Sequence, residues 1–383
     1  MMDAAESPWS ATSTDIHRTI RRYREDDIDA ALATVVDVEG SGYRRPGAKM
    51  VVESGGDSRG AVTAGCLEGP LIEVAKSVIE SGAPSTTTYD LTDDEGAWGL
   101  GLGCNGVIDV LVEPVDASID PALDELAAKR SATVLTAVTS TDPNVEVGDR
   151  CVVTESGRVH EGRPSLPAGV VRQSLGRSDG EAESRQSGYA SVETDEGTVR
   201  VFVDGVEPTP DLLLFGGQED INPVASLARR AGFRVRVATA RGGHADADRF
   251  PAADEVTVVR PADLRDLVDA PAHTYAVLMS HNLLDDSLAL DSLLDAGVPY
   301  VGLMGPRKRF REVRKRLRAD GRELDEAALD RIATPVGLDI GGDEPIAVGF
   351  SIVSELIAVR NGRDGGRLAN RAGPIHERTD AFD

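Results

Sequence analysis

The chain has 383 residues and a formal net charge of −24; hydrophobic residues make up 40% of it and aromatic residues only 4%. This length predicts two domains, or three, and the hydrophobic content suffices for ordinary globular cores. The acidic charge excludes sequence-independent nucleic-acid binding, which needs a basic surface, and no apolar run approaches the roughly 18 residues of a membrane span.

Basic residues and cysteines indicate the expected environment. Only five of the 41 basic residues are lysine. An acid excess with few lysines indicates a halophilic-type protein that works in high salt, where self-repulsion is screened. The cysteines Cys66, Cys104 and Cys151 form no C-x-x-C spacing, which argues for a reduced compartment and against a structural zinc site. Residues 1–15 lack the basic and apolar regions of a signal peptide, so we expect a cytoplasmic protein.

The N-terminal half alternates short β-branched runs with Gly-rich loops. Helices are predicted at 16–30 and at 67–79, and Gly82 ends the second one. Strands are predicted at 31–38, 49–53, 61–64, 85–89 and 107–113. The Gly-rich loops lie between these strands, at 40–48 and 99–106.

A weak internal repeat begins near residue 131. The pattern of residues 33–55 is echoed at 132–157, which indicates a repeated strand-loop-strand unit. Cys151 falls where Met50 lies in the first copy, so we expect a buried, inert thiol. The second copy lacks the glycines and paired arginines of the first loop, which predicts that the first loop is elaborated for a task.

The C-terminal half has a different pattern. After a polar excursion at 173–188, a hairpin at 191–203 and a junction at 207–210, apolar strands alternate with helical segments. These strands are predicted at 212–215, 234–239, 256–259, 275–280 and 300–303, and a last helix at 345–360. The alternation predicts a doubly wound sheet.

The predicted fold class is therefore α/β. An N-terminal mixed-sheet α/β domain is expected at 16–207, with a flexible loop at about 173–188. A C-terminal Rossmann-like doubly wound parallel sheet is expected at 211–362, and a charged tail at 363–383.

The strongest site signal lies in the first Gly-rich loop. Arg44, Arg45 and Lys49 are set among glycines, which let backbone N–H groups approach a ligand; this combination suits a phosphate or another bulky anion. Cys66 begins a helix and could lie near the same ligand as a partly ionised thiol. The alternative is a plain strand-turn-strand with solvated arginines and a buried cysteine.

Cys104 lies in a context similar to that of Cys66, with small neighbours and a regular element after it. Neither thiol has an in-sequence His or Lys partner that would make it a hydrolase nucleophile. A soft sulfur ligand or a transient sulfur contact suits both better. The alternative is that both are buried small residues.

The Rossmann-like segment begins with Gly216 and Gly217, where a phosphate loop belongs. Gln218 stands in place of the expected second glycine, and Thr239 in place of the acid that would bind a ribose. Glu219 and Asp220 would repel a pyrophosphate, so binding of NAD(P) is not expected.

Two further candidates lie in the same half. Arg307 begins a basic helix after a strand, where cations and a helix N-terminus attract anions; the alternative is an ordinary basic helix face. His281 follows a predicted strand, where open α/β sheets bind ligands, and could donate a hydrogen bond or move a proton. A structural role for this lone histidine is the alternative.

Several motifs together resemble a known family. Residues 42–50, 65–69 and 102–106 are similar to the N-terminal motifs of the XdhC/CoxI family, accessory proteins for xanthine and carbon monoxide dehydrogenases. Four further segments are similar to motifs of the family's C-terminal Rossmann domain, at 251–254, 280–282, 300–307 and 335–341. The resemblance runs from about residue 16 to 362, with only a loose match at 114–205.

The resemblance implies maturation of molybdenum enzymes. Such proteins bind the molybdenum cofactor (molybdopterin), protect it while its terminal oxo ligand is exchanged for sulfur, and deliver it to an apo molybdenum hydroxylase, usually as homodimers. By motif match, Arg44 and Arg45 would hold the anionic part. Cys66 and Cys104 would approach the metal or sulfur, and Glu68 would hydrogen-bond the pterin. Gly42, Lys49, Gly65, His281 and Arg307 complete the expected binding residues.

Three functions follow as hypotheses. The first is a chaperone-like maturation factor without turnover of its own. The second is an NAD(P)-dependent oxidoreductase that uses residues 211–340. The third is a sulfurtransferase that relays a persulfide through Cys66, with a cysteine desulfurase as its partner.

Overall fold

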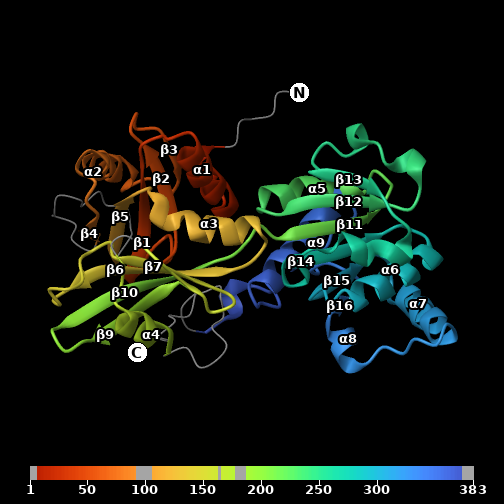
Figure 1. Cartoon of the computed structure of the whole chain (residues 1–383). Coiled ribbons are helices and arrows are strands. Elements are labelled where there is room, and N and C mark those ends of the chain that lie inside the picture. The colour runs from red at the N-terminus through yellow and green to blue at the C-terminus, as the bar shows by residue number, and fades with distance from the viewer. Residues whose placement is uncertain (1–6, 92–105, 163–164, 177–186, 373–383) are drawn as a thin grey trace. The chain divides into compact units, whose positions relative to one another are not determined.

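The computed structural model describes residues 7–91, 106–162, 165–176 and 187–372 of the chain (Figure 1). The described residues divide into two compact units, the first ending at Pro208 and the second beginning at Thr209. None of the helices in these ranges combines the length and the apolar character that a bilayer crossing demands.

The first unit contains two copies of one arrangement: a short 3-10 helix, a helix, three strands, a second helix and two strands. The first copy consists of η1 (Pro8–Ser10), α1 (Ser13–Glu25), β1 (Ala30–Gly40), β2 (Lys49–Glu53), β3 (Ser58–Gly60), α2 (Glu68–Ser81), β4 (Ser85–Asp90) and β5 (Gly106–Pro114). The second consists of η2 (Ala117–Ile119), α3 (Asp120–Ala127), β6 (Ala132–Ser140), β7 (Arg150–Thr154), β8 (Val159–Glu161), α4 (Ala168–Gly176), β9 (Gly188–Glu193) and β10 (Thr198–Val206). The predicted repeat is confirmed and covers the whole unit.

Each copy forms its own five-stranded sheet. The strand orders are β3-β2-β1-β5-β4 and β8-β7-β6-β10-β9, so the two copies share one topology. Every pair of neighbouring strands in the described part of these sheets is antiparallel. The sequence predicted a mixed sheet here. Local turns join β1 to β2, β2 to β3 and the corresponding strands of the second copy, and such short connections allow only antiparallel pairing.

Strand alternation decides which helix covers which face. Along β1, Ala31, Ala33 and Val35 pack with α2, whereas Leu32 packs with α1. In the second copy, Cys151 lies in the equivalent layer with α4. It is fully buried, and burial raises the pKa of its thiol to about 12, so the expectation of an inert thiol is confirmed.

Ion pairs link the two sheets of the first unit. Lys49 of β2 places its Nζ 2.6 Å from Asp204 of β10, and both side chains are almost buried. Arg150 of β7 pairs with Glu113 of β5, and both are buried as well. Taking such charges out of water is costly unless each keeps its partner. The pairs therefore fix how the two copies face one another.

A small cavity of about 20 Å³ lies among these pairs. Its lining includes His17, Lys49, Glu113, Arg150 and Asp204, with apolar side chains of both copies around them. A space of this size holds about one water molecule. It is too small for an organic ligand.

The second unit contains one parallel sheet. Its elements are β11 (Asp211–Gly216), α5 (Ile221–Arg230), β12 (Arg234–Thr239), η3 (Gly242–His244), η4 (Ala247–Arg249), β13 (Glu255–Val258), η5 (Pro261–Leu267), η6 (Pro271–His273), β14 (Thr274–Met279), α6 (Leu283–Asp295), β15 (Tyr300–Leu303), α7 (Arg307–Ala319), α8 (Glu326–Asp330), β16 (Ile332–Ala333), α9 (Pro345–Arg360) and η7 (Leu368–Asn370). The strand order is β13-β12-β11-β14-β15-β16.

Both faces of this sheet are covered, which explains why its strands are continuous apolar runs. Leu212 and Leu214 of β11 pack with α5 and α9 on one face. Leu213 and Phe215 pack with α6, α7 and α8 on the other. The chain order reverses between β11 and β14, where such sheets place their ligand crevice. The predicted α/β class with a Rossmann-like doubly wound sheet is confirmed.

Replacing Asp204 with Ala should destabilise the first unit, because Lys49 would keep a buried charge without its partner. We expect its free energy of unfolding, measured by urea denaturation, to fall by about 3–5 kcal/mol. The control Arg260→Ala removes a more exposed pair with Asp263 and should cost less than about 0.5 kcal/mol. An equally small loss for Asp204→Ala would contradict the buried pair.

Stability should also depend on His17. Burial, and then repulsion from Lys49, lowers the pKa of His17 to about 4. An unfolded histidine titrates near 6.5, so the unfolded chain binds more protons between these values and stability should fall as the pH drops from about 6.5 to about 4. In His17→Gln this slope should shrink by up to about 1.4 kcal/mol per pH unit. Urea unfolding across the range measures it, and an unchanged slope would argue against a buried neutral imidazole.

Candidate functional site

The loops that carry the predicted N-terminal site residues lie at one edge of the first sheet. They are the turn 41–48 and the loop 61–67. The strands β1 and β4 end opposite the start of β5, and β2 begins and β3 ends on the same side. We call these two loops the loop edge. The topology thus brings together segments that are far apart in the sequence.

The turn 41–48 presents two cations. The side chain of Arg44 is half-buried and that of Arg45 is exposed. Within the described ranges, neither forms an ion pair with an acidic residue. A Cβ on Gly42 would lie 2.6 Å from Cγ1 of Val38, so the turn packs tightly on the end of β1. Two guanidinium groups on a close-packed turn suit an anionic ligand.

Lys49 does not join these arginines. It begins β2, and its Nζ lies 2.6 Å from Asp204 and also donates to the carbonyl oxygen of Gly47 at 3.1 Å. The sequence grouped it with Arg44 and Arg45, but the structure turns its charge into the interior. Two cations, rather than three, remain at the turn.

Glu68 holds the loop that carries Cys66. It is the first residue of α2, and its carboxylate accepts hydrogen bonds from the backbone N–H of Thr63 at 2.9 Å, the hydroxyl of Thr63 at 2.6 Å and the N–H of Leu67 at 3.2 Å. A carboxylate is also favoured at a helix N-terminus. The geometry therefore gives Glu68 a positioning role.

Cys66 and Gly65 lie in the loop that Glu68 holds. The Cys66 side chain is half-buried and packs against the core beneath α2. Gly65 has a φ of +118°, which other residues rarely adopt, and apart from its chain neighbours no described residue has an atom within 4 Å of where its Cβ would be. The loop thus combines a partly accessible thiol with a glycine that no other described residue crowds.

The start of β5 lies beside the first turn. Leu91 donates its N–H to the carbonyl oxygen of Gly106 at 3.0 Å. A Cβ on Gly106 would lie 2.7 Å from the carbonyl oxygens of Glu39 and Ser41, so only glycine fits against the start of the turn. Cys104 lies outside the described residues.

The second copy shows what the same edge looks like without these features. There Thr194 donates to Asp142 at 2.6 Å, and the hydroxyl of Thr141 accepts from the N–H of Thr198 at 2.8 Å. A Cβ on Gly197 would lie 2.7 Å from that hydroxyl oxygen. The second copy closes its loops with its own side chains, whereas the described residues of the first copy place two arginines without ion pairs on the equivalent turn.

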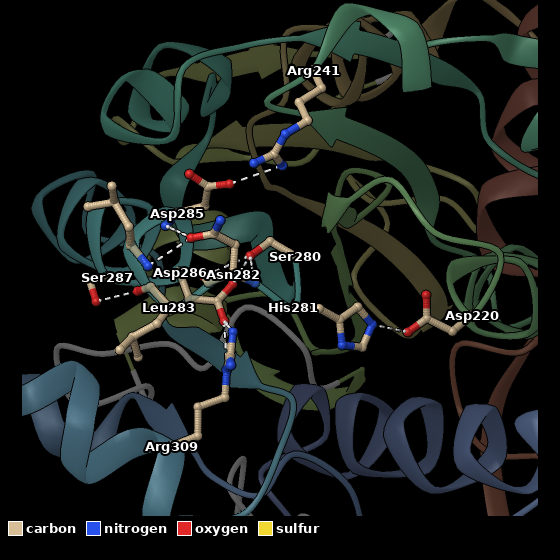
Figure 2. Close-up of polar contacts among 11 residues, drawn as sticks. Asp220, Arg241, Ser280, His281, Asn282, Leu283, Asp285, Asp286, Ser287 and Arg309 are labelled. Atoms are coloured by element: carbon tan, nitrogen blue, oxygen red, sulfur yellow. Dashed lines mark hydrogen bonds and ion pairs between the residues drawn. The ribbon is translucent and has the colours of Figure 1, made fainter.

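His281 lies in the second unit, at the carboxyl edge of its sheet. Figure 2 shows its Nε2 facing Asp220, and the distance to Oδ2 is 2.7 Å. Its φ of +57° is uncommon for a residue other than glycine and carries strain. Asn282 follows and caps α6 by accepting from the N–H of Leu284 at 2.9 Å. The side chain of His281 is half exposed, at 52%.

A buried network supports this loop. Asp286 of α6 is 1% exposed and accepts hydrogen bonds from Ser280 and from Nε of Arg309, the latter at 2.9 Å (Figure 2). Sequence reasoning missed Asp286 and Arg309. The helix α6 contains several aspartates, and nothing in the sequence shows which of them is buried. The network fixes the backbone that carries His281.

The strands β11 and β14 stay paired up to their carboxyl ends, where Gly216 lies opposite Met279. A Cβ on Gly216 would lie 2.5 Å from the carbonyl oxygen of Met279. Asp220 and Glu219 stand at the start of α5, and they pair with His281 and with Arg249, the latter at 2.8 Å. Carboxylates therefore occupy the helix N-terminus where a dinucleotide would place its pyrophosphate.

Arg307 begins α7 with an exposed side chain. This helix carries eight of the 41 basic residues of the chain and a single acidic one. Arg307 and His281 belong to the second unit, whereas the loop edge belongs to the first.

Comparison with known proteins gives a family. The model of the XdhC Rossmann domain matches residues 212–356, and the model of the XdhC and CoxI family matches residues 24–90. The chain belongs to the XdhC/CoxI family. The two matches fall on the second unit and on the copy that carries the loop edge.

Relatives of this XdhC/CoxI-family protein span almost its full length. A probable xanthine dehydrogenase subunit of Bacillus subtilis is 28% identical over 349 residues, which cover 90% of this chain and 98% of that protein. The molybdenum cofactor insertion chaperone PaoD of Escherichia coli is 24% identical and 92% of each chain is covered. A crystal structure of a xanthine dehydrogenase from Bacillus halodurans matches with a TM-score of 0.73 at 26% identity, covering 94% of this chain and 98% of that one.

Replacing Glu68 with Ala in this XdhC/CoxI-family protein should loosen the loop that carries Cys66. Three hydrogen bonds would be lost, so we expect the thiol to react several-fold faster with an alkylating reagent, and the unit to lose about 1–2 kcal/mol. The rate is measured in a Cys104→Ser background. Glu73→Ala, which changes an exposed residue of the same helix, is the control. Equal rates in both variants would contradict the positioning role.

Proposed function

We propose that this protein binds the molybdenum cofactor at the loop edge and takes part in maturing a xanthine dehydrogenase-type hydroxylase. The observation that carries the proposal is the contrast between the two copies of the first unit. The second copy closes the equivalent loops with its own side chains, whereas the described residues of the first present Arg44 and Arg45 on one loop and a half-buried thiol beside an uncrowded glycine on the other. The names of two relatives, a cofactor insertion chaperone and a probable xanthine dehydrogenase subunit, support the same role.

The described residues fit the chemistry of this ligand. Arg44 and Arg45 would hold its phosphate, because guanidinium groups bind phosphate through two parallel hydrogen bonds. Cys66 would face its sulfur-ligated metal, and no described residue beyond the chain neighbours crowds Gly65 beside it. Glu68 would keep the thiol in place rather than contact the pterin. When bound, the cofactor supplies the molybdenum whose terminal oxo ligand is exchanged for sulfur.

The finer parts of the proposal concern partners. A molybdenum hydroxylase would receive the cofactor, and a cysteine desulfurase would supply sulfur while Cys66 and Cys104 shield or contact the metal. We further propose that the protein acts as a homodimer in the cytoplasm. The partly accessible Cys66 supports the sulfur contact.

An NAD(P)-dependent oxidoreductase is a weaker proposal. At the crevice of the second unit, Glu219 and Asp220 already occupy the start of α5. Gln218 and Thr239 replace the small and acidic residues of a dinucleotide site. Saturable binding of NADH at micromolar concentration would favour it again.

The decisive variant is Arg44→Ala/Arg45→Ala. Wild-type protein purified from a molybdenum-competent host should contain about one molybdenum per chain, measured by elemental analysis, and release a fluorescent oxidised pterin. Without both guanidinium groups we expect at least a tenfold lower content, since charge-assisted hydrogen bonds contribute about 1.5–3 kcal/mol each.

Arg229→Ala/Arg230→Ala is the matched control, because it removes the same charge from an exposed part of α5. Its molybdenum content should equal that of the wild type. A correctly folded Arg44→Ala/Arg45→Ala variant with wild-type content would refute the proposed site.

A further inference from the structure

An exposed pair of aromatic side chains lies at the loop edge. The rings of Trp9 and Tyr43 have centroids 6.0 Å apart and are tilted by 36°. They remain 38% and 57% exposed. The chain has only two tryptophans and few aromatic residues overall, so two of them left in contact and open to solvent need an explanation.

Their positions join two parts of the same site. Tyr43 precedes Arg44 in the turn 41–48. Trp9 belongs to η1, which lies beside β3, the strand that leads into the loop of Cys66. Both aromatic side chains are therefore near the segments that present the cations and the thiol.

The second copy again serves as an internal comparison. Its equivalent short helix, η2, reads Ala-Ser-Ile. Its equivalent turn, at 141–149, contains no aromatic residue. The aromatic pair is thus specific to the copy that carries Arg44 and Arg45, and the repeated fold does not require it.

An aromatic face next to guanidinium groups recognises a flat heteroaromatic ring that carries a phosphate. We propose that Tyr43, supported by Trp9, is the surface on which the pterin ring of the cofactor stacks while Arg44 and Arg45 hold its phosphate. The inference rests on the proposed function and names the residues that would select the ring.

The geometry decides how the ring would lie. A ring inserted between two aromatic faces needs them about 7 Å apart, because each stacked contact takes about 3.5 Å. The two rings are tilted by 36° with their centroids 6.0 Å apart, so they do not form two parallel faces with such a gap. The ligand ring would therefore stack on Tyr43 alone, which is the more exposed of the two, while Trp9 supports Tyr43.

The experiment uses the full chain with Trp98→Phe, so that tryptophan fluorescence reports on Trp9. Neopterin phosphate, GMP and inorganic phosphate are titrated in turn. We expect saturable quenching with neopterin phosphate. Tyr43→Ala should weaken this binding about 5- to 150-fold, as stacking on an aromatic side chain contributes about 1–3 kcal/mol. Tyr43→Phe should restore it, and the affinity for inorganic phosphate should not change.

Phe350→Ala is the matched control, because it removes an exposed aromatic side chain from the second unit. The proposal is overturned if wild-type protein binds no neopterin phosphate, or if Tyr43→Ala binds it as well as the wild type. It is also overturned if GMP binds the wild type as tightly as neopterin phosphate does and loses as much affinity in Tyr43→Ala. The site would then recognise a nucleobase rather than a pterin.

Molybdenum content separates this proposal from the proposed function. Wild-type protein that contains molybdenum but fails the neopterin test loses only the stacking role. Wild-type protein without molybdenum refutes the proposed function, whatever the fluorescence shows.

Discussion

The ion pairs between the two sheets of the first unit are the constraint on which its site depends. Lys49 with Asp204, and Arg150 with Glu113, bury four charges where one copy meets the other. Each charge is tolerable only while its partner stays in place, so the two copies can face one another in few ways. Because Lys49 begins β2 directly after the turn 41–48, the same pairing holds one end of the loop edge.

Much of the fold could be predicted from the sequence, because it rests on local patterns. The apolar run of β11 indicates a strand buried on both faces, and the echo of Met50 by Cys151 indicates the repeat. The orientation of Lys49 could have been predicted as well. Side chains alternate along a strand, so Lys49 must face the opposite side from Met50 and the same side as Val51, away from α2.

The site was harder to predict, since its contacts join residues that no spacing relates. The cations of the turn are visible in the sequence, but nothing there says that Asp204 neutralises one of them. Trp9 lies far from Tyr43 in the chain and outside the recognised motifs. The position of Glu68 predicted a hydrogen bond to the pterin. In the structure its carboxylate accepts from backbone N–H groups of its own loop, as an acid at the start of a helix can do.

The duplicated topology has a consequence for how the protein can change over evolutionary time. A solitary sheet must keep its rim self-satisfied in order to fold, which leaves little freedom for chemistry there. When a second copy is bound to it through buried charges, the loops of one sheet can lose their internal hydrogen bonds while those of the other sheet keep them. Substitutions that change ligand binding should therefore accumulate in one copy of the pseudo-symmetric pair. Lineages that diverge in ligand should differ in the loops of that copy long before they differ in the other.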